Sequence, residues 1–110
     1  MPFIPNMQGG TNAIVASSGN SQNLAIPNGA GLEVALFNSD SSNDAFIEFG
    51  TSNQVVATAP TDGQAAGGSM LIPHGTVAPL ILTMPAGTTF WAVTARAGSP
   101  RVTLTRGRWA

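Results

Sequence analysis

The fold of this chain is decided by the stretch LEVALFNSDSSNDAFIEFG, residues 32–50. Two apolar segments, 32–37 and 45–50, flank a polar block, 38–44, that contains only Asn, Ser and Asp. These short polar side chains bond to nearby backbone groups and favour turns. Because successive side chains of a β-strand point to opposite faces, each arm can press one face against a core. The stretch therefore predicts a β-hairpin with a long loop.

Both faces of this expected hairpin carry apolar side chains. Val34 and Leu36 share one face of the first arm, whereas Phe37 lies on the opposite face with Glu33. In the second arm, residues 45, 47 and 49 share one face, and Phe46 lies on the opposite face. A hairpin that is apolar on both sides needs a second covering, which comes either from this chain or from a neighbour.

The rest of the chain repeats short apolar segments between turns. Strands are expected at 11–16, 22–26, 54–58, 69–72, 77–84, 88–95 and 100–106. The first two are expected to form a second hairpin. The segment 77–84 is expected at a sheet edge, because Pro79 cannot donate a ladder hydrogen bond. With 13 Gly and 8 Pro, the chain predicts an all-β, antiparallel, jelly-roll-like sandwich of about eight or nine strands without a substantial helix.

Charged residues are unusually scarce. They make up 8% of the chain, and the net charge is −1, whereas globular domains typically carry about 25% charged residues. A net charge near zero promotes association. We therefore expect part of the surface to be buried in an assembly, with a homo-oligomer among the partners. The alternative is a monomer whose surface is rich in amides and hydroxyls.

The chain divides into an extended arm (1–10), a sandwich domain (11–107) and a short tail (108–110). Two prolines and two glycines disfavour a helix in the arm. The arm either docks on its own sheet or reaches a neighbouring subunit, and both alternatives stay open. Neither a secretory signal nor an apolar run long enough for a membrane helix is recognised.

Catalytic and metal chemistry find little support. The one histidine, His74, lies in a turn and lacks the sequence context of a nucleophile, so no enzyme activity and no cofactor are expected. Asp40 and Asp44 offer oxygen ligands, but their spacing matches no calcium loop. Capping of the turn is the alternative to a bound cation, and we expect no metal.

The charges are segregated along the chain. All five acids lie before residue 63, and all four bases are arginines that lie after residue 95. Arg106 and Arg108 are therefore expected to pair either with Glu33 or Glu48 of the same chain, or with the acidic half of an adjacent copy. A nucleic-acid surface would need a net basic face, so no nucleic acid is expected.

Two aromatic residues suggest a different class of function. An outward Trp91 or Phe37 would serve as an interface anchor or as a platform for stacking on a sugar. The alternative for Trp91 is an ordinary core position.

The sequence resembles small β-sandwich proteins encoded among tailed-phage virion genes. The resemblance covers residues 31–107 and rests on the order of five segments: VALFN (34–38), AFIEFG (45–50), MLIPHG (70–75), FWAVTA (90–95) and VTLTRG (102–107). Such proteins are similar to head decoration (cement) proteins of jelly-roll type, or to minor tail and fibre parts. The resemblance implies no catalytic residues.

Together, these observations predict a structural virion protein, made in the host cytoplasm, that binds the capsid exterior. Its partners would be the major capsid protein lattice and further copies of itself. The alternative is a minor tail, fibre or vertex component that binds carbohydrate. The residues expected at interfaces are Phe3, Ile4, Met7, Phe37, Trp91, Arg106, Arg108 and Trp109.

Overall fold

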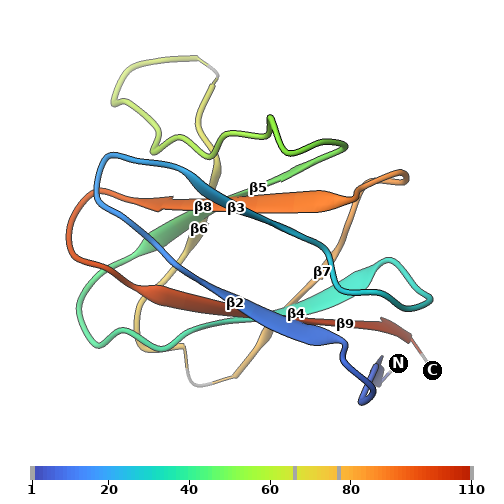
Figure 1. The fold of residues 1–110 in the computed structure, drawn as a ribbon. Helices are drawn as coiled ribbons and strands as arrows, with labels where there is room; N and C mark the ends of the chain where they lie inside the picture. Colours follow the sequence, from blue (N-terminus) through green and yellow to red (C-terminus); the bar gives the residue numbers. More distant parts are fainter. Residues whose placement is uncertain (1, 66, 77, 110) are drawn as a thin grey trace.

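A computed structural model describes residues 2–65, 67–76 and 78–109 as two antiparallel β-sheets packed face to face (Figure 1). One sheet has the strand order β1-β9-β4-β7, with β2 also paired to β9, and the other has the order β3-β8-β5-β6. No helix occurs among the described residues. The predicted all-β sandwich is therefore confirmed. Its strands are β1 (Phe3–Pro5), β2 (Thr11–Val15), β3 (Gln22–Ala25), β4 (Glu33–Asn38), β5 (Ala45–Gly50), β6 (Met70–Ile72), β7 (Leu80–Thr83), β8 (Phe90–Ala95) and β9 (Arg101–Trp109).

The strand order follows from one long hairpin that has been rolled up. Antiparallel pairs join β2 to β9, β3 to β8, β4 to β7 and β5 to β6, so the hairpin turns at the connection 51–69. Rolling brings β4 beside β9 and β5 beside β8, which completes the two sheets. Eight strands wrapped in this way form a jelly roll.

The two hairpins expected from local sequence are not formed. β4 and β5 belong to different sheets, and so do β2 and β3. The polar block 38–44 crosses from one sheet to the other instead of turning back along the same sheet. The inner faces of the two arms therefore meet across the sandwich, where Val34 and Leu36 of β4 share one buried cluster with Ala45 and Ile47 of β5.

The core fills the space between the inner faces of the two sheets. Val102 and Leu104 are fully buried, as their alternation in β9 predicts. Trp91 of β8 is the largest of the fully buried side chains. The remaining core positions come from both sheets in the same alternating way, so hydrophobic burial links the layers.

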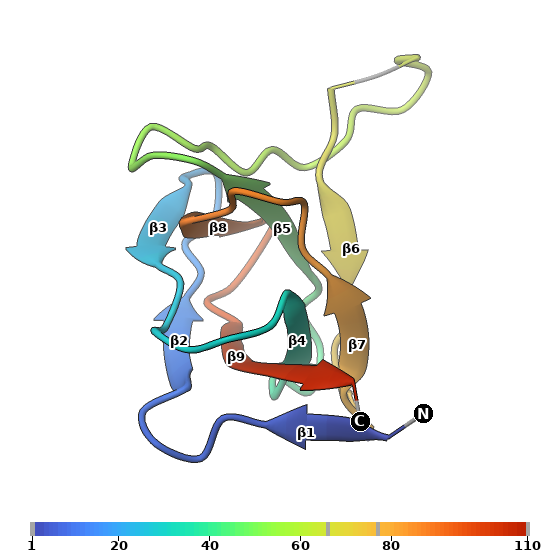
Figure 2. The same cartoon turned by 90° about the vertical axis from the view of Figure 1, so that its right-hand side faces the viewer.

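The outer face of the four-stranded sheet receives its covering from the same chain. The first part of the connection from β5 to β6 runs over this face (Figures 1 and 2), and Phe46 is only 5% exposed there. The backbone N–H of Ala57 donates to Ser21 Oγ (2.9 Å), and Asn23 Nδ2 donates to Asn53 O (2.9 Å). The predicted strand at 54–58 is therefore wrong, because the segment forms no ladder. Side-chain bonds and one backbone bond, from the N–H of Ser69 to Thr58 O (2.8 Å), hold it instead.

Two further expectations concern the strand edges. β7 lies at the edge of its sheet, and Pro79 immediately precedes it, as predicted; residue 77 of the expected segment lies outside the described residues. The N-terminal arm contributes β1, which pairs with β9 of its own chain. β9 itself continues through Trp109.

Asn38 organises the end of the sandwich opposite the chain termini. The residue is fully buried, and its Nδ2 donates to Asn43 O (3.0 Å) and Ile72 O (3.1 Å). Its Oδ1 accepts the backbone N–H of Asp40 (3.1 Å). One side chain thus ties the 38–44 connection to the end of β6.

Replacing Asn38 by Leu should lower the free energy of unfolding by about 2–3 kcal/mol, because one buried and two partly buried backbone groups would lose their partner. Urea denaturation followed by circular dichroism measures this change. The control is Asn53→Ala, because the Asn53 side chain is exposed and its Oδ1 accepts one surface hydrogen bond, from Gln54 Nε2 (3.3 Å); the effect of this substitution should stay within about 0.5 kcal/mol. Equal effects of the two substitutions would contradict the role of Asn38.

Candidate interaction surface

The two chain ends meet in one projecting tip. β1 pairs with the last residues of β9, so that Phe3 lies opposite Trp109 and Ile4 lies opposite Arg108. The rings of Phe3 and Trp109 form an edge-to-face pair with a centroid distance of 6.4 Å and an interplanar angle of 83°. Both termini lie at the same end of the sandwich (Figure 1). The arm and tail residues that the sequence suggested separately therefore meet at one end of the sandwich, hereafter the tip: Phe3, Ile4, Met7, Arg108 and Trp109. Phe3 and Trp109 lie on one face of the β1–β9 pair, and Ile4 and Arg108 lie on the other.

A bulge between β1 and β2 shapes the tip. The backbone N–H of Asn6 donates to Arg106 O (2.8 Å), and that of Arg106 donates to Gly10 O (2.7 Å). β1 and β2 therefore follow β9 as one interrupted strand, and the residues between them project. Gly10 is required at the base of the bulge, because a Cβ atom there would collide with the backbone of Asn6. Met7, in this bulge, is 84% exposed.

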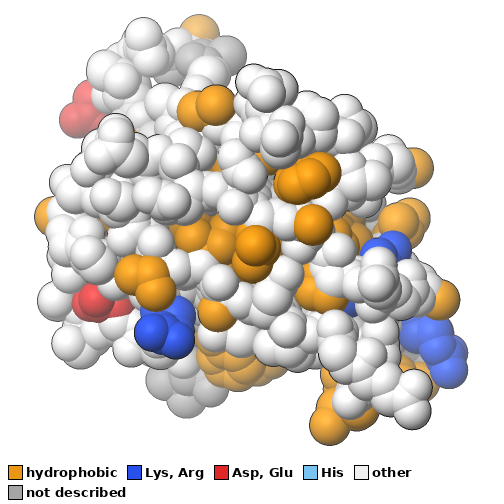
Figure 3. Space-filling view, viewed as in Figure 1, with side chains coloured by type: hydrophobic (Ala, Val, Ile, Leu, Met, Phe, Trp, Pro, Cys, Tyr) orange, Lys and Arg blue, Asp and Glu red, His pale blue; other side chains and the backbone are white. Residues whose placement is uncertain are grey.

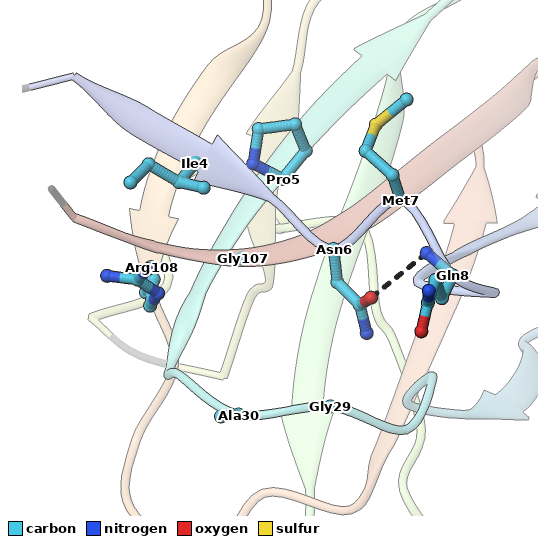
Figure 4. A pocket seen from close by; sticks show the side chains of 9 residues that line it. All are labelled: Ile4, Pro5, Asn6, Met7, Gln8, Gly29, Ala30, Gly107 and Arg108. Carbon is cyan, nitrogen blue, oxygen red and sulfur yellow. Dashed lines mark hydrogen bonds between the residues drawn. The ribbon is translucent and has the colours of Figure 1, made fainter.

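A shallow groove of about 490 Å³ lies between the tip and the connection from β3 to β4. Gly29, Ala30 and Gly107 contribute little side chain to its lining. Asn6 and Gln8 point toward the segment of Gly29 and Ala30, whereas Met7 points away from it (Figure 4). Asn6 bridges the two walls, because its Nδ2 donates to Asn28 O (2.8 Å). The sequence did not predict this hydrogen bond, although Pro5, Gly9 and Gly10 near Asn6 are residues typical of turns.

The two arginines near the tip differ in what they contact. Arg106 is half-buried; its Nε donates to Gly31 O (2.9 Å) and its guanidinium also donates to Pro27 O (3.0 Å). It holds the β3–β4 connection against β9, so its guanidinium is used within the fold. The side chain of Arg108 is exposed and makes no hydrogen bond or ion pair with the described residues. Of these two, only Arg108 is left to meet a partner.

The charges do not pair as expected. Among residues 2–65, 67–76 and 78–109, the one ion pair joins His74 to Asp44. Glu33 instead accepts the backbone N–H of Trp109 (3.3 Å), and Glu48 accepts the hydroxyl of Ser69 (2.7 Å). Neither of the expected arginine–carboxylate pairs within the chain is therefore formed in the described part.

Trp91 is not a surface residue. Its side chain is fully buried between the sheets, which corrects its prediction as an interface anchor or sugar platform and agrees with the core alternative. Phe37 is placed differently: it lies on the outer face of the five-stranded sheet and is 37% exposed. The structure thus separates Phe37 from the tip.

At the opposite end of the sandwich, Asp40 and Asp44 organise turns. Asp40 Oδ1 accepts the backbone N–H groups of Ser42 (2.8 Å) and Asn43 (2.9 Å), and these bonds lower the pKa of its carboxyl. Asp44 accepts the backbone N–H of His74 (2.9 Å) and contacts its ring Nδ1 (2.6 Å). The described residues contain no group of three or more His, Cys, Asp or Glu side chains arranged to hold a metal ion. Both carboxylates serve as caps here.

Comparison with known proteins adds no family. No protein-family model, curated protein or solved structure matches the chain. The described residues also include no helix that could span a membrane. The exposed tip is therefore the candidate functional site on the strength of its own geometry. Apolar side chains lie beside basic ones at this end, while charged side chains are sparse over the rest of the same view (Figure 3).

The Asp44–His74 contact predicts a pH-dependent contribution to stability. The backbone N–H of His74, followed by its ring, lowers the pKa of Asp44 below the ordinary value of 3.8. Because the folded pKa is depressed, this stabilisation is present above about pH 4 and is lost as the pH falls through the folded pKa. Asp44→Asn should therefore be less stable than the parent at pH 7, by less than about 1 kcal/mol for so exposed a pair.

Thermal unfolding at pH 7 and at pH 2.5 measures the difference between the parent and Asp44→Asn. The difference should shrink at the lower pH, because protonation of Asp44 removes the charge that distinguishes it from Asn. An identical difference at the two pH values would contradict the electrostatic origin of the effect.

Proposed function

We propose that the protein is a structural component of a bacteriophage virion, of the head decoration type, that binds the outside of the capsid shell. The observation that carries the proposal is the tip, in which both chain ends present apolar side chains beyond the body of the sandwich. Apolar groups exposed together at a protein surface mark interaction sites. Binding through such a surface requires no catalytic residue, so the proposed role is passive binding.

The composition of the tip fits contact with another protein. Met7 and Ile4 would bury apolar area, Trp109 would act as an aromatic anchor, and Arg108 would pair with a carboxylate of the partner. The scarcity of charge elsewhere favours residence in an assembly over a free monomer.

The shell lattice would amplify weak contacts. Each tip is small, but many copies on one lattice, in contact with one another, gain avidity from multivalency. A protein that binds only the assembled shell stabilises it by mass action. Bridging of neighbouring capsid subunits would follow from this selective binding. The jelly-roll topology is compatible with the role, because viral capsid proteins are among the proteins that use it, although a fold alone does not define function.

Met7→Ser should weaken binding to purified capsid shells by about tenfold or more, since burying a methionine side chain contributes about 1.5–3 kcal/mol. Quantitative co-sedimentation with shells measures the occupancy. The matched control is Val56→Ser, at an apolar residue that is 62% exposed on the connection 51–69, away from the tip. Equal binding by the parent and Met7→Ser would contradict the use of the tip.

Copy number in purified virions tests the placement independently. Quantitative mass spectrometry against the major capsid protein should give hundreds of copies per particle for shell decoration. A handful of copies would instead move the protein to the tail or a vertex, and absence from the particle would refute the virion assignment.

A further inference from the structure

The outer faces of the two sheets differ in their covering. The four-stranded sheet is covered by its own chain, and Phe46 and Thr94 are buried on its outer face. The first part of the connection from β5 to β6 runs over this face, and the hydroxyl of Thr94 donates to Asn20 O (2.8 Å). The five-stranded sheet has no comparable strap among the described residues, and it leaves Val15 48% exposed and Phe37 37% exposed. An apolar sheet face that the chain does not cover is a candidate for covering by another protein.

The register of the strands defines this face, hereafter the open face. Alternation turns Val102 and Leu104 of β9 inward, so Arg101, Thr103 and Thr105 turn outward. Their partners in β2 and β4 share that face, and so do the residues of β7 that pair with those of β4. Nearly all of these residues are apolar or carry a hydroxyl group. The members on these three strands are Thr11, Ala13, Val15, Glu33, Ala35, Phe37, Ile81 and Thr83.

The charges of the open face stand at its two ends. Arg101 lies at one end, opposite Val15, and Glu33 lies at the other end, opposite Gly107. Along β9 the two ends are about 20 Å apart, at about 3.3 Å per residue. Neither side chain forms an ion pair with the described residues. The face therefore carries opposite charges that are separated along the strand direction.

We propose that a second copy of this chain packs on the open face, with its strands running antiparallel to those of the first. The two-fold axis lies in the plane of the interface, perpendicular to the strands, so it reverses the strand direction of the second copy. Residue 101 of each copy then lies level with residue 107 of the other. Arg101 therefore faces Glu33 of the other copy, because Glu33 pairs with Gly107. The same operation sets Phe37 against Ala35 of the second copy, so that a large side chain meets a small one. Sheets that pack in this aligned way lie about 10 Å apart.

Charge complementarity is the reason to choose a second copy as the occupant. The open face has one positive end and one negative end. When a second copy lies antiparallel to the first, each positive end meets a negative end, so the face is complementary to itself, as an isologous interface requires. A partner with one sign of charge would match only one of the two ends. This inference goes beyond the proposed function, and in the antiparallel arrangement the tips of the two copies lie at opposite ends of the dimer.

Sedimentation equilibrium of the full chain over a range of concentrations tests the proposal. The parent should form a dimer, and Phe37→Glu should weaken dimerisation at least about tenfold, because the substitution buries a charge at the centre of the interface. The matched control is Val56→Glu, which introduces the same charge at an exposed apolar residue outside the open face and should dimerise like the parent. A monomeric parent, or equal losses in both variants, would overturn the proposal.

A charge exchange tests the antiparallel arrangement. Arg101→Glu and Glu33→Arg should each weaken the dimer, because each sets like charges against one another. The chain that carries both substitutions should recover to within about threefold of the parent, since both pairs are restored in reversed order. Circular dichroism verifies folding, and the milder Arg101→Gln and Glu33→Gln replace any variant that fails to fold. A double exchange no better than the single ones would refute the pairing.

Discussion

The ladder along β9 is the interaction on which the rest of the structure depends. β9 pairs with β4 on one side and with both β2 and β1 on the other, so it joins the centre of the five-stranded sheet to the N-terminal arm. Its inward residues Val102 and Leu104 are fully buried in the core. Its last residues then continue beyond the core and build the tip. One strand therefore determines both the stability of the sandwich and the position of its most exposed apolar residues.

The sequence reveals the strands better than it reveals their partners. Alternation identified β4, β5, β8 and β9 because each has a distinct inner face, and this property is local. Alternation does not distinguish a strand that turns back along its own sheet from one that crosses to the opposite sheet, since the inner face is apolar in both cases. The block 38–44 therefore suggested a hairpin, whereas buried Asn38 draws it toward the end of β6. The segment 54–58 was mistaken for a strand because covering an outer face also requires apolar residues.

The tip was predictable in composition but not in geometry. The residues expected at interfaces include Phe3, Ile4, Met7 and Trp109, but only the long-range register shows that Phe3 meets Trp109. The distinction between the two arginines was equally hidden. Arg106 contacts backbone carbonyls of Pro27 and Gly31, and such acceptors exist at every residue and leave no mark in a sequence. Trp91 shows the same limit. It follows Phe90 in one strand, and the sequence does not indicate which of the two rings faces inward.

Because this protein has few charged residues, charge protects little of its sheet surface from association with other proteins. Natural sheets protect edges and faces with charged side chains, yet no Asp, Glu, Lys or Arg lies between Asp62 and Arg96. The chain covers one sheet face with its own connection 51–69 and leaves the other face open. Because Arg101 and Glu33 stand at opposite ends of that open face, the proposed association of two copies would be favoured in the antiparallel orientation and disfavoured in the parallel one. In the proposed dimer, scarcity of charge would work together with placement of charge: apolar area would supply the tendency to associate, and two charges would select the arrangement.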